Sequence, residues 1–287
     1  MPEVKIDSIR ISSSELESYN TDLFGIEEQL TELLTSSENM LTRSGEEIFR
    51  KLEIKNNLLL CGKPGVGKTR SVYWLSKKLK EFKKDFNLDL YSVKLGTILS
   101  ENLGESSRNL EKLFENLREQ AKDGTIIILF IDEIDSIGLS RWKITENDGI
   151  RRVLSTLFVE LDKNVNLPTF IFVAATNRAD LLDSALIRRF SRIIRFPEEM
   201  NKTAFEAFIR YIFDFEFSEN DLVKLYEIVE SLKLTPSDIK ECFTIAYLNS
   251  KDLQSDLIES ISDALVKRVS LVLHDETEKE IFKVKSG

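Results

Sequence analysis

The stretch Gly62-Lys63-Pro64-Gly65-Val66-Gly67-Lys68-Thr69 decides the fold of this 287-residue chain. It follows the apolar run 58–61 and precedes a segment, 72–82, whose apolar residues recur at helical spacing. Strand, glycine-rich loop and helix, in that order, are what a phosphate-binding loop requires. The glycines let backbone N–H groups turn toward an anion, and the start of the helix adds partial positive charge. The alternative, a chance glycine-rich turn, does not explain the strand and helix on either side.

Two side chains of this loop indicate the ligand. The Lys68 ammonium can neutralise the β- and γ-phosphates of a nucleotide, and the Thr69 hydroxyl can ligate Mg²⁺, which prefers oxygen ligands. The sequence therefore predicts a site for ATP and Mg²⁺. The nucleotide-binding residues that we predict in this segment are Lys63, Pro64, Gly65, Val66, Gly67, Lys68, Thr69 and Arg70.

An acidic pair follows the most apolar strand candidate, residues 125–131. In parallel α/β sheets the ligand crevice lies outside the carboxyl ends of the strands, so Asp132 and Glu133 are expected there. We predict that Asp132 holds Mg²⁺ and that Glu133 orients or deprotonates the attacking water. Without a phosphate-binding loop upstream, the alternative interpretation of this pair would be two solvated acids at the start of a loop. For Asp135 we expect a helix cap or a surface acid.

Strand and helix patterns alternate up to about residue 196, and helical patterns dominate afterwards. This order predicts an α/β fold of the P-loop NTPase type, with three layers built on a parallel sheet, followed by a small all-helical lid. Residues 1–20 are polar and serine-rich, and we expect them to be irregular. The predicted organisation is a short extension (1–20), a large α/β ATPase subdomain (21–198), a helical lid (199–272) and a charged tail (273–287).

Composition excludes several classes of function. The net charge of −9 and the pI near 5.0 disfavour sequence-independent nucleic-acid binding. Two cysteines are too few for a disulfide scaffold, and Cys61 is expected to be a small buried hydrophobe. The single histidine, His274, excludes histidine triads and zinc clusters. No apolar run is long enough for membrane insertion and no signal core opens the chain, so we expect a cytoplasmic protein.

With these motifs in place, the chain resembles the classical AAA branch of the AAA+ ATPases from residue 21 to about 265. The segment Asp22-Leu23-Phe24-Gly25-Ile26 is similar to the start of the family's ATPase domain, where backbone near the glycine contacts adenine. Residues 151–162 are similar to the helix of its second region of homology. Residues 234–246 resemble the lid motif, although Pro236-Ser237 replaces the usual Gly-Ala pair. The resemblance implies adenine contacts at Phe24, Gly25 and Ser237.

The resemblance also implies a site completed by a neighbouring subunit. Residues 174–178 are similar to the sensor-1 strand, which gives Asn177 the role of positioning the water or the γ-phosphate; a turn-forming Asn is the alternative. Residues 182–192 resemble the arginine-finger segment. Aligning Phe196-Pro197 with the equivalent residues of the family makes Arg189 and Arg192 the fingers. Because this alignment needs a two-residue deletion, Arg188 remains an alternative. A finger acting on the neighbour's nucleotide implies a ring, usually a homohexamer.

One position departs from the family pattern. Members that thread polypeptides usually carry an aromatic residue two positions before the glycine aligned with Gly104, and here that residue is Asn102. An amide grips a peptide less well than an aromatic ring. The leading hypothesis is a ring ATPase that remodels or disassembles a protein substrate, alone or through an adaptor. The alternatives are a nucleotide-gated scaffold that does not thread substrate and, further behind, a nucleic-acid motor or loader.

Overall fold

The computed structural model describes residues 8–94, 103–136, 148–164, 167–213, 217–250 and 257–267. The chain divides into two compact units. The first comprises Met1–Lys63 with Lys68–Phe196, and the second comprises Pro64–Gly67 with Pro197–Gly287. No helix in the described part of the chain is long and apolar enough to cross a membrane.

The first unit is built on a six-stranded sheet with the order β1-β3-β4-β5-β2-β6. All neighbouring strands run parallel except β1, which pairs antiparallel with β3. The predicted parallel α/β fold is therefore confirmed, with one added antiparallel edge. The strand bounds are β1 Ser8–Ser12, β2 Asn57–Cys61, β3 Asn87–Lys94, β4 Thr125–Asp132, β5 Phe170–Thr176 and β6 Arg192–Arg195.

The edge strand β1 corrects the expectation that residues 1–20 are irregular. Strand β1 and the short helix α1 (Ser13–Leu16) lie in that segment. Serine-rich composition concealed a short alternation, in which Ile9 and Ile11 lie on the same face of the strand; Ile11 is buried, whereas Ile9 keeps 66% of its surface exposed. Arg10 lies between them and forms a 2.9 Å ion pair with Asp89 of β3.

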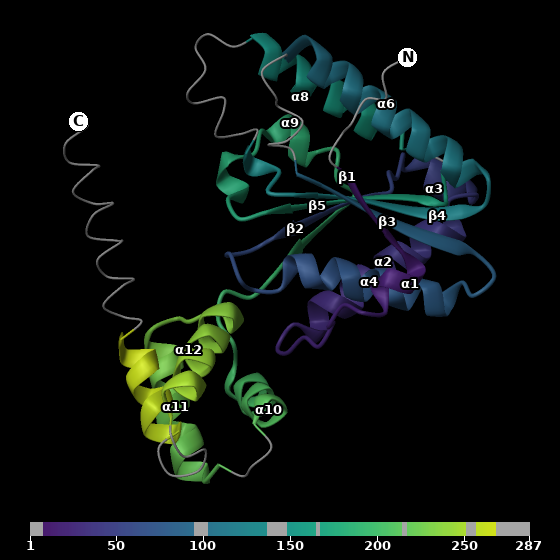
Figure 1. The fold of residues 1–287 in the computed structure, drawn as a ribbon. Coiled ribbons are helices and arrows are strands. Elements are labelled where there is room, and N and C mark those ends of the chain that lie inside the picture. Colours follow the sequence, from purple (N-terminus) through teal and green to yellow (C-terminus); the bar gives the residue numbers. More distant parts are fainter. Residues whose placement is uncertain are drawn as a thin grey trace. The chain divides into compact units, whose positions relative to one another are not determined.

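Helices cover both faces of the sheet, as Figure 1 shows. Helices α6 (Leu103–Lys122) and α8 (Asp148–Asp162) lie on one face, and α2 (Glu27–Arg43) and α4 (Lys68–Phe82) lie on the other. The short helix α3 (Glu47–Lys51) connects α2 to β2. Strand β5 is buried along its whole length, as expected of a central strand covered on both faces.

A buried ion pair joins α6 to α8. The guanidinium of Arg118 lies 2.5 Å from the carboxylate of Glu160, whose side chain is 1% exposed. Arg118 also donates to the backbone oxygen of Glu160 and to the side-chain oxygen of Asn164. These bonds satisfy both charges inside the fold, which is what makes their burial tolerable.

The second unit is helical, as the sequence predicted. It contains α10 (Lys202–Ile212), α11 (Glu219–Ser231), α12 (Pro236–Asn249) and a further helix over residues 257–267. Its core is aromatic, with Phe208 and Phe243 stacked at 6.0 Å between ring centroids. Thr235 and Asp238 form a capping box at the start of α12, which fixes where that helix begins.

Candidate active site

The glycine-rich loop connects β2 to α4 through backbone conformations that other residues rarely adopt. Gly65 has φ +81° and Gly67 has φ +101°. A side chain at either position would strain the backbone, so glycine is the natural residue at both. Lys68 and Thr69 follow as the first two residues of α4. Their side chains thus start from the helix N-terminus, where anions are favoured.

Lys68 is the centre of the site. Its side chain is buried, and Nζ donates to the backbone oxygens of Gly62 (2.6 Å) and Lys63 (2.8 Å) and to Oδ1 of Asn177 (2.8 Å). Burial lowers the pKa of the Lys68 ammonium below its ordinary value, and the nearby carboxylate of Asp132 opposes that shift. The three accepting oxygens and the nearby carboxylates stabilise the positive charge of the Lys68 side chain at the base of the loop.

The predicted magnesium ligands lie side by side. Oγ1 of Thr69, on α4, donates a 2.8 Å hydrogen bond to Oδ2 of Asp132, the last residue of β4. A hydroxyl and a carboxylate at this separation form a cluster of hard oxygen atoms, and Mg²⁺ usually binds proteins through one or two such groups together with substrate phosphates. These residues therefore suit Mg²⁺ that arrives with a nucleotide.

Glu133 is held in an uncommon backbone conformation directly after β4. Its φ is +51°, in the left-handed region, and its N–H donates to Oδ1 of Asp132 at 2.9 Å. The next residue, Ile134, donates its N–H to the backbone oxygen of Ala175 on β5. The side chain of Glu133 is exposed, so solvent can reach its carboxylate. A strained residue beside a predicted metal ligand is typical of a functional position.

Asp135 corrects the prediction of a surface acid. Its side chain is 6% exposed, and Oδ1 accepts hydrogen bonds from Oγ1 of Thr176 (2.8 Å) and from the N–H of Asn177 (3.3 Å). Asn177 in turn accepts from Lys68. Asp135 thus links the segment after β4 to the residues that end β5. The sequence alone did not predict this link. Its only sign there was an acidic residue two positions after the Asp132-Glu133 pair.

The site gathers residues from the carboxyl ends of three strands. Lys68 follows β2, Asp132 ends β4, and Asn177 follows β5. The strand order places β5 between β4 and β2, so these ends are neighbours. The crevice at the carboxyl edge of a parallel sheet is where such folds bind ligands.

The three candidate arginines differ in their intramolecular contacts. Arg189 pairs with Asp162 at 3.0 Å and stacks over the ring of Phe158, with 4.5 Å between the guanidinium carbon and the ring centroid. Arg192, the first residue of β6, pairs with Glu32 of α2 while 55% of its side chain stays exposed. Arg188 follows the short helix α9 (Ser184–Ile187) and is exposed.

The residues predicted to contact adenine lie in both units. Phe24 and Gly25 precede α2; Gly25 has φ +74°, and its N–H donates to Oε1 of Glu27. Arg70 turns back to bond Asn20. Ser237 is an exposed residue in the first turn of α12. The remaining predictions at Asn102 and His274 fall outside the described residues.

The fold and this cluster together define a P-loop nucleotide-binding protein. The model of the family described as "ATPase family associated with various cellular activities (AAA)" matches residues 58–198, which contain every residue of the cluster. The chain belongs to this AAA family. The resemblance inferred from the sequence is thereby confirmed.

Curated relatives extend the likeness beyond these residues. The chain is 34% identical over 261 residues to the proteasome-activating nucleotidase of Saccharolobus solfataricus, covering 86% of this chain and 63% of that protein. It is 31% identical over 219 residues to a Corynebacterium efficiens protein named "AAA ATPase forming ring-shaped complexes", covering 75% and 41% respectively. This chain therefore spans less than two thirds of the length of these relatives.

Solved structures support the same fold. A chain of the "E. coli MS115-1 HORMA:CdnC:Trip13 complex" aligns with a TM-score of 0.77 over 91% of this chain and 94% of that chain, at 18% identity. The C. elegans PCH-2 structure aligns with a TM-score of 0.70 over 94% and 78%, also at 18% identity. At this identity both likenesses bear on the fold alone.

Proposed function

We propose that this protein is a ring-forming ATPase that binds ATP with Mg²⁺, hydrolyses it, and uses the energy to remodel a protein partner. One observation carries the proposal: Lys68 is hydrogen-bonded to Asn177, and the next residue, Thr69, is hydrogen-bonded to Asp132, so residues that follow three separate strands meet in one site. Membership of the AAA family supports the same conclusion.

Each residue of the cluster has a role in this proposal. Lys68 exchanges its carbonyl contacts for the β- and γ-phosphates, and the backbone N–H groups of residues 65–70 surround them. Thr69 and Asp132 would hold Mg²⁺, which supplies charge neutralisation on the phosphates. Glu133 accepts the proton of the attacking water or orients it, and Asn177 positions that water against the γ-phosphate.

Completion of the site by a neighbour is part of the proposal. A guanidinium that neutralises the transferring phosphoryl group is worth roughly 10³–10⁵ in rate. Arg192 has an exposed side chain and only a surface ion pair to release, which suits action in trans. Arg189 must first release Asp162 and Phe158, whereas Arg188 has no such contact with the residues that the structure describes. We retain Arg189 and Arg192 as the proposed fingers, with Arg188 as the alternative.

The assembly proposed is a homohexameric ring. The name of the Corynebacterium efficiens relative describes ring-shaped complexes, and that of the Saccharolobus solfataricus relative describes action on a proteasome. By analogy, a protein substrate or adaptor is the partner proposed for this chain. The large subdomain (21–198), the lid (199–272) with adenine contacts at Phe24, Gly25 and Ser237, and the cytoplasmic location stay predictions.

The second candidate, a nucleotide-gated scaffold, is favoured by one residue of the sequence. Asn102 stands where threading members carry an aromatic residue, so ATP could drive assembly while hydrolysis resets it. An unfolding assay separates the two functions. Unfolding of a tagged globular protein that depends on ATP would favour remodelling by threading, whereas ATP-dependent assembly without unfolding would favour the scaffold.

The proposal is tested by sizing the Glu133→Gln variant with and without ATP. Glutamine keeps the shape of the side chain but cannot accept a proton, so bound ATP should persist. Light scattering should then report a species about six times the 33.1 kDa monomer mass with ATP and a smaller one without it. A variant that binds ATP tightly and remains a monomer would contradict the ring.

A further inference from the structure

The chain reaches α2 by way of a segment that lies along α4. We call residues 17–22 of this segment the N-terminal strap; it starts where α1 ends and leads to the predicted adenine-contact residues Phe24 and Gly25. Helix α1 contacts both α4 and β3, so the start of the strap is fixed on the first unit. Its end lies two residues from Phe24. The path of the strap therefore decides where the predicted adenine contacts lie.

Two side chains of α4 hold the middle of the strap. The ring of Tyr73 packs on the ring of Tyr19, with 4.6 Å between the centroids and 32° between the ring planes. Nζ of Lys77 donates to the backbone oxygen of Tyr19 at 2.8 Å and to that of Glu17 at 3.4 Å. Tyr73 and Lys77 stand four residues apart on the helix, so one face of α4 makes both contacts.

Asn20 directs the strap toward Phe24. Its Oδ1 accepts a hydrogen bond from the N–H of Asp22 at 2.9 Å, and the same oxygen accepts from Arg70 of α4. The guanidinium of Arg70 also donates to the backbone oxygen of Asn20 at 3.3 Å. An Asn side chain that bonds the backbone two residues further on forms an Asx turn, which sets the direction of the chain. The strap is thus attached to α4 at three successive points.

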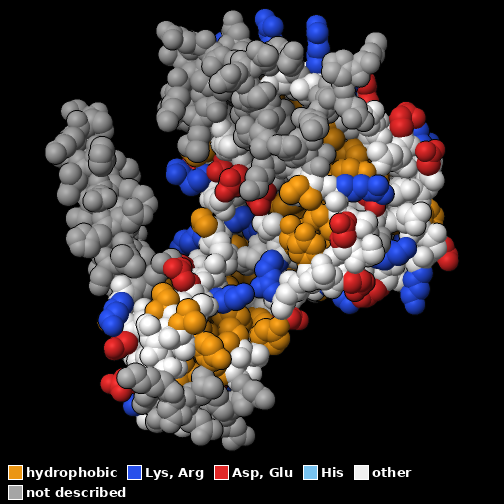
Figure 2. Space-filling model, in the orientation of Figure 1, with side chains coloured by type: hydrophobic (Ala, Val, Ile, Leu, Met, Phe, Trp, Pro, Cys, Tyr) orange, Lys and Arg blue, Asp and Glu red, His pale blue; other side chains and the backbone are white. Residues whose placement is uncertain are grey.

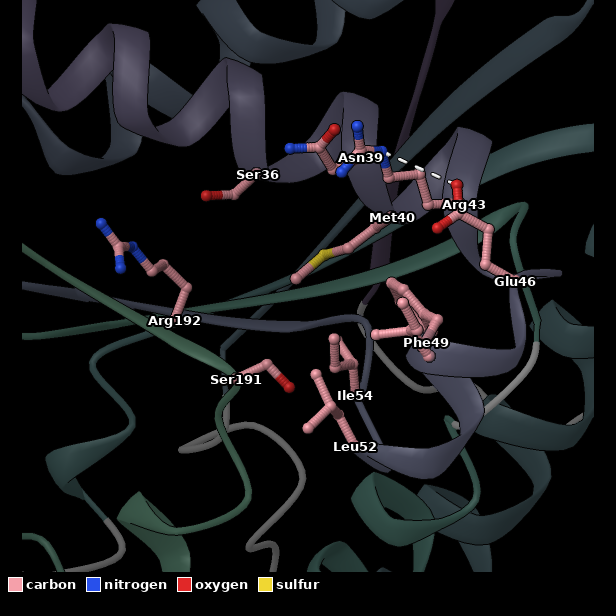
Figure 3. Close-up of a pocket in the computed structure, with 11 residues that line it drawn as sticks. Ser36, Asn39, Met40, Arg43, Glu46, Phe49, Leu52, Ile54, Ser191 and Arg192 are labelled. Carbon is pink, nitrogen blue, oxygen red and sulfur yellow. Dashed lines mark ion pairs between the residues drawn. The ribbon is translucent and has the colours of Figure 1, made fainter.

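The other end of residues 22–25 is fixed in a different way. Ile26, directly before α2, and Met40 of α2 are both buried. Figure 3 shows Met40 among the apolar side chains of Phe49 and Ile54, in a hollow of about 320 Å³. Hydrocarbon packing therefore anchors α2, whereas polar and aromatic contacts with α4 anchor the strap.

We propose that Tyr73 and Lys77 are positioning residues for the recognition of adenine. The inference rests on the proposed function, in which Phe24 and Gly25 contact the base. By holding the strap, Tyr73 and Lys77 keep these two residues in place before ATP arrives, so less chain freedom is lost on binding. When the strap is detached in part of the population, the apparent dissociation constant of ATP rises as the competent fraction falls.

The test compares Mg-ATP with Mg-triphosphate, an inorganic probe that has the phosphates but no base. Tyr73→Ala removes the aromatic pair, and Lys77→Ala removes the two hydrogen bonds. Calorimetric titration in the Glu133→Gln background measures both affinities without turnover. Each variant should weaken ATP binding about three- to tenfold and change triphosphate binding by less than about twofold, the range for loss of one aromatic pair or one charge-assisted hydrogen bond outside the phosphate loop. In the hydrolysing protein the loss should raise the KM for ATP and leave kcat within about twofold, because it acts on binding rather than on the transition state.

Three variants serve as controls. Tyr73→Phe keeps the ring and should bind ATP like the parent. Lys78→Ala removes one positive charge from the next position of α4, where Lys78 pairs with Glu81, and it should also bind ATP like the parent. Figure 2 shows acidic and basic side chains interspersed on the face of the first unit that it draws, so one surface charge should add little to the attraction of ATP. Tyr19→Ala removes the same ring pair from the strap side, and it replaces Tyr73→Ala if that protein does not melt cooperatively.

Equal ATP affinity in the parent and in folded Tyr73→Ala or Lys77→Ala would overturn the proposal. Equal losses for ATP and triphosphate would also overturn it, as would an effect on kcat in place of KM. A loss in Lys78→Ala as large as that in Lys77→Ala would contradict the role of Lys77, because charge alone would then explain it. A parent that binds neither ATP nor triphosphate would instead refute the nucleotide site of the proposed function.

Discussion

Replacement of Asp135 by alanine tests whether this buried acid holds the sensor residue in place. Asp135→Ala removes the acceptor for the Thr176 hydroxyl at 2.8 Å and for the Asn177 N–H at 3.3 Å. Leaving a buried donor unpaired costs about 1–3 kcal/mol. Thr176 is fully buried and the Asn177 bond is long, so we expect a loss of about 2 kcal/mol in the free energy of unfolding.

The same change should reduce catalysis more than binding. Without Asp135, the bond to Lys68 is the one hydrogen bond that Asn177 keeps within the described part of the chain, and a displacement of about 1 Å in a positioning group can cost roughly a hundredfold in rate. We therefore expect kcat to fall about 10- to 100-fold. ATP affinity should change only a few-fold, since the phosphate loop is untouched.

Steady-state ATPase kinetics measure kcat, nucleotide titration measures ATP affinity, and urea unfolding measures the free energy of unfolding. Asp135→Asn is the matched control, because it keeps one acceptor oxygen and nearly the same volume while removing the charge. Its kcat should lie between those of the parent and Asp135→Ala. If folded Asp135→Ala hydrolysed ATP within twofold of the parent, the positioning role would be refuted.

Three further predictions concern stability and the metal. Arg118→Ala leaves Glu160 buried and paired with Lys163, which is partly exposed. The free energy of unfolding should therefore fall by about 3 kcal/mol, and an unchanged urea midpoint would argue against a stabilising buried pair. Arg189→Ala should lower the free energy of unfolding by about 1–2 kcal/mol through loss of both its pair with Asp162 and its stacking over Phe158, whereas exposed Arg188→Ala should change it by less than about 0.5 kcal/mol; equal melting temperatures would refute this difference. Chelation of divalent cations should abolish ATP turnover, and turnover that persisted in chelator would contradict the proposed metal ligands.

Much of the fold could be predicted from the sequence because its strongest elements are local. The strand before the loop, the apolar strand before Asp132 and the helix after Thr69 are specified by short patterns of apolar residues and glycines. Parallel strands covered on both faces are apolar throughout, so β4 and β5 were visible as continuous runs. Burial of Cys61 followed from the same pattern and is confirmed.

The remainder depended on tertiary contacts that short patterns do not encode. Strand β1 is specified by pairing with β3 rather than by its own composition, since Ile9 and Ile11 are its only apolar residues. Asp135 became identifiable only when β4 and β5 were placed side by side, because its partner Thr176 lies 41 residues away. Likewise, the ion pair between Arg189 and Asp162 joins α8 to the segment before β6 and has no signature in spacing.

We propose that this site hydrolyses ATP and that Glu133 activates the attacking water. The most direct measurement compares phosphate release by the parent and by Glu133→Gln, with ATP binding titrated in both. We predict unchanged ATP affinity and a loss of turnover of at least about a hundredfold in the variant. Comparable turnover in the two proteins would contradict it.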